Sequence, residues 1–304
     1  MSKPVFSKPA LRRDELARVL IRRGLSGISE SELSQKLQYI NYYRLRGYTY
    51  PYQDNSHEES LFIDGISWET IWSDYVFDSE LRILLFDGIS RFEIALRSIV
   101  TQLMSEYKGP YWYTDKSLFL SEAKFRRDLQ ELKDAWNRSK DDFKNHFVEN
   151  YNSGSLPPAW MIFETSTLGL VSKYFENLNK SLEPRTMIMR QFGFNRSSGK
   201  VFLSWIRQLT YIRNICAHHA RLFSRRLTCS CIIPTNLEVL RLNESPDANK
   251  VYVCICILTY LLSICAPDYS FKEKLFHLLD NASESHLRFM GCPKSWKEQP
   301  LFMS

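Results

Sequence analysis

The stretch SWETIWSDYVFDSELRILLFDGISRFEIALRSIVTQLMSEY, residues 67–107, predicts one long amphipathic helix. Its apolar side chains recur every three or four positions, which is the spacing of a single buried helix face. The residues on this face are Leu81, Leu84, Leu85, Ile89, Phe92, Leu96, Ile99 and Leu103. Gly88 is expected to mark a bend, and Glu93 and Arg97, four residues apart, are expected to pair along the helix. Strand signals are almost absent around this stretch, so we expect an all-α fold.

Helix signals continue on both sides of the long stretch. On the N-terminal side, Pro9 opens the helical run LRRDELARVLIRRG, and Ser29 and Glu32 form a capping box before a helix that reaches about Tyr39. On the C-terminal side, helices are expected over residues 121–150 (one or two), 167–178, 183–192, 201–223, 248–266 and 270–290. We therefore expect a single all-α domain over residues 1–304, with a basic N-terminal segment (1–60), a core (67–226) and C-terminal helices (235–304).

The net charge of +6 is concentrated near the N-terminus. Residues 1–50 contain ten Lys or Arg and four Asp or Glu, whereas the rest of the chain holds 30 of each sign. Such asymmetry favours a polyanionic partner such as RNA, because basic side chains that neutralise phosphates release bound counterions. A solvated basic helix explains the same asymmetry and stays an alternative. The candidate RNA-binding residues of this segment are Lys8, Arg12, Arg13, Arg22, Arg23, Arg44 and Arg46.

Residues 40–52, INYYRLRGYTYPY, combine aromatic and basic side chains. Their rings could stack on unpaired bases while Arg44 and Arg46 contact phosphates. A Tyr-rich stretch more often packs into the interior of a protein, and we favour that interpretation.

Other function classes find little support. The polar N-terminus lacks the apolar segment of a secretory signal, and the longest apolar run, Val251–Ala266, is shorter than the roughly 18–20 residues that cross a bilayer. Of the seven cysteines, Cys229 and Cys231 form a C-x-C without a second pair at zinc-ligand spacing. We expect a cytoplasmic protein without membrane span, disulfide, metal or cofactor.

One segment gathers groups suited to catalysis. The sequence RNICAHHARLFSRR, residues 213–226, places two histidines and four arginines close together. RNA carries its own nucleophile, the 2′-hydroxyl, so a ribonuclease needs a proton donor or acceptor and fixed positive charge rather than a metal. An imidazole, with an ordinary pKa of about 6.5, supplies the first, and a guanidinium supplies the second. The candidate catalytic residues are Arg213, His218, Asn214 and His219, and Arg221 and Arg225 extend the RNA-binding set.

The spacing of this motif raises a geometric question. Five residues of a regular helix correspond to about 140° of rotation, so Arg213 and His218 do not share a face. The long side chain of Arg213 could partly reach around the helix. We favour the alternative, in which two protomers pool their motifs in a composite site, because it also supplies a second imidazole, so that base and acid are different groups. Asn214 lies four residues before His218 and is expected to orient its ring. A pair of ordinary helix-end histidines, stabilised by the helix dipole, remains the alternative.

The order of five segments resembles the Abi-like abortive-infection family, which includes AbiD and AbiF. The segments are KPALRRDELARVLIRRGL, LQYINYYRLRGYTYPY, YVFDSELRILLFDGISRFEIALRSIV, LPPAWMIFETSTLGLVSKYFENL and SWIRQLTYIRNICAHHARLF, from residue 8 to about 223. The resemblance implies a HEPN-like helical bundle with additional N- and C-terminal helices. It also implies the HEPN signature, Arg followed by four to six residues and His, here Arg213 and His218 with His219 as the alternative.

The same resemblance implies partners and a supporting residue. HEPN ribonucleases usually pair two such motifs at a dimer interface, and some members of the Abi-like family accompany a small structured RNA. Glu164 matches an acidic position of the family, and we expect either a buried salt bridge or a role in orienting Arg213 or His218.

The sequence thus predicts a metal-independent endoribonuclease of phage defence, of the abortive-infection or toxin type, acting as a homodimer. The alternative is a non-catalytic RNA-binding module that holds a structured small RNA, or an infection sensor.

Overall fold

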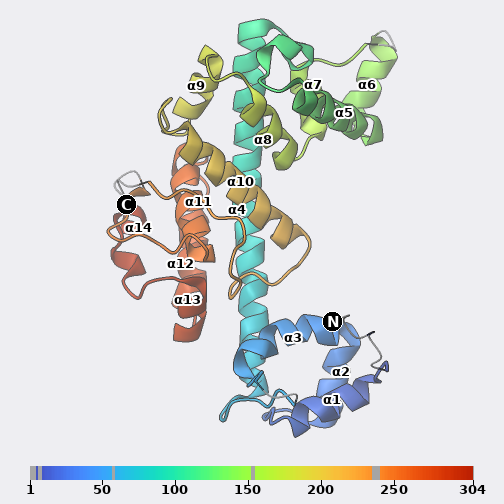
Figure 1. Cartoon of the computed structure of the whole chain (residues 1–304), viewed down its shortest axis with the longest axis vertical. Helices are drawn as coiled ribbons and strands as arrows, with labels where there is room; N and C mark the ends of the chain where they lie inside the picture. The colour runs from blue at the N-terminus through green and yellow to red at the C-terminus, as the bar shows by residue number, and fades with distance from the viewer. Residues whose placement is uncertain (1–4, 6–8, 57–58, 152–154, 235–239, 304) are drawn as a thin grey trace. The chain divides into compact units, whose positions relative to one another are not determined.

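The computed structural model describes residues 5, 9–56, 59–151, 155–234 and 240–303. Over these ranges the chain is built from α-helices and short 3-10 turns, without a β-strand, which confirms the all-α prediction (Figure 1). The helices are α1 (Arg13–Arg22), α2 (Glu30–Tyr39), α3 (Tyr42–Thr49), α4 (Trp68–Lys108), α5 (Glu122–Arg138), α6 (Asp142–Asn150), α7 (Ala159–Ile162), α8 (Leu168–Asn177), α9 (Glu183–Arg190), α10 (Gly199–Ala217), α11 (Val251–Cys265), α12 (Phe271–Asp280), α13 (Glu284–Met290) and α14 (Pro300–Met303).

The chain forms two compact units, residues 1–80 and residues 81–304. In the first unit α1 packs against α2, and the predicted capping box is confirmed because the Glu32 N–H donates to Ser29 Oγ and the Ser29 N–H to the Glu32 carboxylate. Helix α1 begins at Arg13, later than expected from Pro9, because Glu15 accepts the backbone N–H of Arg12 (2.6 Å) and fixes the first turn there. The division into domains remains a prediction.

The packing expected of the Tyr-rich stretch, residues 40–52, is present for two of its five tyrosines. Tyr48 and Tyr52 are buried, and their hydroxyls donate to Asp78 (2.7 Å) and Asp74 (2.9 Å) on the first part of α4. Tyr43 and Tyr50 are exposed, so part of the aromatic surface remains available to a base.

The second unit is organised by the face that α4 buries. The six apolar residues predicted from Leu81 to Leu96 are all buried, which confirms that part of the face. Farther on, Val100 and Met104 are buried, whereas Ile99 and Leu103 are only half-buried, so the prediction was wrong for the last turns. Both pairs are apolar and adjacent on the helix, and only the neighbouring elements decide which pair is covered.

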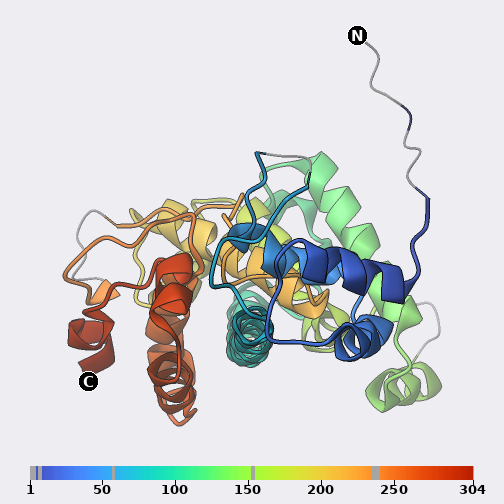
Figure 2. The ribbon, with the colours of Figure 1, turned by 90° about the horizontal axis from the view of Figure 1, so that it is seen from below.

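Gly88 has a packing role in this unit. The helix continues through it, and a Cβ atom there would lie 2.9 Å from side-chain atoms of Leu258 on α11 and Phe271 on α12. The glycine therefore allows the C-terminal helices to approach α4 closely. Figure 2, which looks almost along α4, shows α11 and α12 on one side of it.

Helix α10 occupies the middle of the second unit, in contact with α8 and α11, and α8 also packs on α5. The expected C-terminal helix over residues 270–290 is two helices. Ser283 Oγ accepts the N–H of His286 and starts α13 anew, and Gly291 ends it in the left-handed conformation (φ 72°). No helix in the described ranges is long and apolar enough to cross a membrane.

Candidate functional site

A nearly buried carboxylate, Glu93 on α4, lies at the centre of the candidate site. Only 8% of the surface of Glu93 is exposed to solvent. The carboxylate accepts the backbone N–H of Leu168 (2.8 Å), the first residue of α8, and an N–H of Arg97 (3.3 Å). The positive end of the α8 dipole adds to this stabilisation of negative charge. Glu93 and Arg97 pair along α4 as predicted from their spacing.

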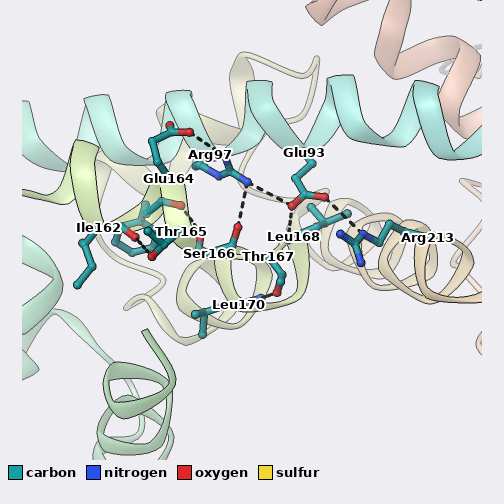
Figure 3. Close-up of polar contacts among 11 residues, drawn as sticks. Glu93, Arg97, Ile162, Glu164, Thr165, Ser166, Thr167, Leu168, Leu170 and Arg213 are labelled. Atoms are coloured by element: carbon teal, nitrogen blue, oxygen red, sulfur yellow. Dashed lines mark hydrogen bonds and ion pairs between the residues drawn. The ribbon is translucent and has the colours of Figure 1, made fainter. Parts of the chain in front are cut away.

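Arg97 extends this cluster toward Glu164. Its side chain, 11% exposed, donates to the Glu164 carboxylate (2.9 Å) and to the Ser166 carbonyl (3.0 Å), as Figure 3 shows. Glu164 was expected to form a buried salt bridge or to orient Arg213 or His218. The bridge is present, but its partner is Arg97 and the Glu164 side chain is 54% exposed, because it extends from the surface turn that precedes α8.

Arg213 reaches the same carboxylate from α10. Its Nε atom lies 3.7 Å from Glu93 Oε2, and its guanidinium lies over the Phe86 ring, 5.5 Å from the ring centre. The side chain is 29% exposed, so it is fixed on one side and open to solvent on the other. A guanidinium held in this way keeps its positive charge in place while it can still contact an anion from solvent.

The two histidines lie at the point where α10 ends. Ala217 is the last helical residue, His218 is the C-cap, and its N–H donates to the Asn214 carbonyl (3.0 Å). His219 adopts the left-handed conformation (φ 55°), which turns the chain away from the helix axis. Both imidazoles and the Asn214 side chain are exposed. Among the described residues, no hydrogen bond joins the Asn214 amide to the His218 ring, so the orienting role predicted for Asn214 stays untested.

The predicted RNA-binding residues fall in both units. In residues 1–80, most of them contact other side chains. Arg12 pairs with Asp14, Arg13 donates to Gln38, Arg23 and Arg44 donate to the hydroxyls of Tyr42 and Tyr75, and Arg46 lies over the Tyr50 ring. Arg22 is exposed, and Lys8 lies outside the described residues. In residues 81–304, Arg221 donates to Ser224 (2.9 Å), and Arg225 is half-buried.

The metal-ligating side chains and the thiols of the described residues are dispersed or unpaired. No group of three or more His, Cys, Asp or Glu is arranged to hold a metal ion there. All seven cysteines are free thiols, and burial raises the pKa of Cys231 to about 12, which keeps this thiol protonated.

Comparison with known proteins shows to which family the chain belongs. The family model described as Abi-like protein matches residues 35–224, more than half of the chain. The chain belongs to the Abi-like family. The match covers Glu93, Arg97, Glu164, Arg213 and His218. It begins at residue 35 and so excludes helix α1, although the resemblance noted from the sequence began at residue 8. No curated protein and no solved structure gives a significant match.

Membership of the Abi-like family suggests a role in abortive infection, a defence against phages. The sequence did not predict that Glu93 and Phe86 contact Arg213. A signal for the Glu93 contact was present: Glu93 directly follows Phe92 on the buried face of α4, and a carboxylate in such a place needs a cationic partner.

Proposed function

We propose that this Abi-like protein is a metal-independent endoribonuclease whose catalytic groups are Arg213 and His218. The observation that supports the proposal is the placement of Arg213. Glu93 and the Phe86 ring hold its guanidinium on α4, and Arg213 lies about one helical turn before the end of α10, where His218 is exposed. Cleavage by the 2′-hydroxyl requires a fixed cation and an exposed imidazole, and Arg213 and His218 supply these two groups.

The reaction follows from these groups. An imidazole removes the proton of the 2′-hydroxyl, and the 2′-oxygen attacks the adjacent phosphorus. Negative charge builds on the non-bridging oxygens, where the Arg213 guanidinium stabilises it. The bond from phosphorus to the 5′-oxygen breaks, and the leaving oxygen takes a proton from a second imidazole. The products are a 2′,3′-cyclic phosphate and a 5′-hydroxyl, and no water or metal takes part.

The need for two imidazoles leads to a homodimer with a composite site. A single His218 cannot be base and acid in one step, and a second protomer brings another. The α4 surface beside Arg213 favours this arrangement. Ile83 and Ile94, both exposed, stand eleven residues apart, which is about three turns of an α-helix, so they share one face. Phe86, whose ring contacts the Arg213 guanidinium, extends this apolar surface.

The dimer is tested by placing a charge on that surface. Ile83→Glu is expected to shift the protein from dimer to monomer in sedimentation velocity and to remove cleavage in parallel, because a carboxylate opposes burial of the apolar surface. The control is Ile264→Glu on α11, an exposed isoleucine away from the α4 surface. A monomeric wild type that cleaves RNA would rule out the composite site.

The catalytic proposal is tested first by metal removal. Purified wild type is expected to cleave a labelled RNA pool at the same rate with and without EDTA, and end-group analysis should find 2′,3′-cyclic phosphates and 5′-hydroxyls. Loss of cleavage in EDTA would contradict the mechanism. Intact RNA that copurifies with the protein, without strand scission, would instead support an RNA-binding module. Absence of any RNA affinity would favour an infection sensor.

A further inference from the structure

A second region of residues 81–304 has the properties of a binding site. A pocket of about 880 Å³ is formed by the first turn of α5, the C-terminal end of α8, α9 and the first turns of α10. This volume lies in the range of small-molecule pockets in proteins. None of its lining residues is a candidate catalytic residue, so the pocket is distinct from the Arg213 site.

The lining of this pocket is strongly basic. Its six cationic side chains are Lys124, Lys180, Arg185, Arg196, Lys200 and Arg207. The single carboxylate in the lining, Glu176, is already shared between Lys124 (3.6 Å) and Arg207 (2.8 Å). In the described part of the chain the other four cations have no ion pair. A concave surface with such an excess of positive charge concentrates anions.

Arg185 is the cation that a ligand would stabilise most. The residue is 5% exposed, and its Nε atom has no hydrogen-bond partner among the described residues. Its guanidinium lies over the Phe175 ring (5.3 Å), and burial together with the nearby charge of Arg196 lowers its pKa. Burial of a guanidinium without a counter-charge costs free energy, so an anion bound in the pocket would stabilise the folded protein.

The N-terminus of α10 adds to the attraction of the pocket for anions. Gly199 and Lys200, the first residues of this 19-residue helix, line the pocket. Ser198 is the N-cap, but its hydroxyl donates to the Asn195 carbonyl and makes no hydrogen bond to the first turn of α10. The N–H groups of an uncapped first turn and the helix dipole favour a phosphate at this end.

We propose that this pocket binds a polyphosphate group, either the triphosphate of a free nucleotide or that of an RNA 5′ end. Phosphodiesters along an RNA strand carry one charge each and are spread over its length. A triphosphate instead gathers several charges in a small volume, which matches a pocket with four unpaired cations. Leu203 and Ile232, also in the lining, offer apolar surface to the attached nucleoside.

The proposal is tested by calorimetric titration of the full chain with tripolyphosphate, ATP and a short 5′-triphosphorylated RNA. The matching 5′-hydroxyl RNA is the reference ligand, and His218→Ala protein avoids cleavage in the RNA titrations. The test variant is Arg196→Gln/Lys200→Gln, two exposed side chains whose loss leaves the core intact. The control is Lys133→Gln/Arg138→Gln on α5, which removes the same charge outside the pocket.

We expect the test variant to weaken triphosphate binding at least about tenfold and the control to leave it unchanged. Binding of ATP and tripolyphosphate would identify a nucleotide site, and binding of the triphosphorylated RNA alone would identify an RNA-end site. Failure of every triphosphate to bind would overturn the proposal, as would equal weakening in both variants. Since the readout is binding, its outcome is independent of whether the chain cleaves RNA.

Discussion

Replacing His218 with alanine is expected to lower the rate of RNA cleavage by about 10²–10⁴-fold, which is the usual contribution of general acid–base catalysis. The exposed position of His218 at the C-cap of α10 makes the substitution mild for the fold. Arg213→Ala should lose about 10²–10³-fold, the effect of removing one group that stabilises transition-state charge. Single-turnover cleavage of a labelled RNA in EDTA measures both rates.

The matched control is His277→Ala, an exposed histidine on α12 far along the chain from the motif. It should cleave at the wild-type rate. His219→Ala distinguishes the two spacings of the motif: if it removes activity while His218→Ala keeps it, His219 is the catalytic group and the assignment of His218 is wrong. Cleavage that survives in every variant would point to a contaminating nuclease.

Glu93→Gln is expected to lower the free energy of unfolding by about 3 kcal/mol, the low end of the cost of breaking a buried ion pair. The amide retains the oxygen that accepts the Leu168 N–H, but it no longer offsets the charges of Arg97 and Arg213. Arg213 also loses its anchor, so cleavage should fall as well. Urea denaturation followed by circular dichroism measures the stability, and the cleavage assay measures the activity.

Glu164→Gln provides the comparison for this variant. Glu164 pairs with the same Arg97, but its side chain is more than half exposed, so the expected cost is below about 1 kcal/mol. If the two variants are equally stable, the buried Glu93 carboxylate does not organise the cluster.

The sequence predicts the helices of this protein better than their contacts. Periodic apolar residues revealed the buried face of α4 as far as Leu96, and Ser29 marked the start of α2, because these signals are local. The contact between Glu93 and Arg213 is not local. Each residue is recognisable as a charged group on its own helix, but only the packing of α8 and α10 against α4 brings them together.

Counting charges along the chain could not locate the basic pocket for the same reason, because its cations come from separate elements. Residues 51–304 are balanced overall, so the sequence directed attention to the basic N-terminal segment. The fold nevertheless brings six cationic side chains to the pocket formed by α5, α8, α9 and α10, while most of the compensating carboxylates lie elsewhere. A sum along the chain averages over surfaces that only the tertiary structure separates.

The order of synthesis decides when the Glu93 carboxylate meets its partners from other helices. Its contacts come from Leu168 and Arg213, which leave the ribosome well after α4. A growing chain therefore has no anchored Arg213 until α10 has emerged and docked, since domains form as their segments become available. Under the proposed activity, the nascent protein lacks an anchored Arg213, and cannot cut RNA, until most of its own message has been translated.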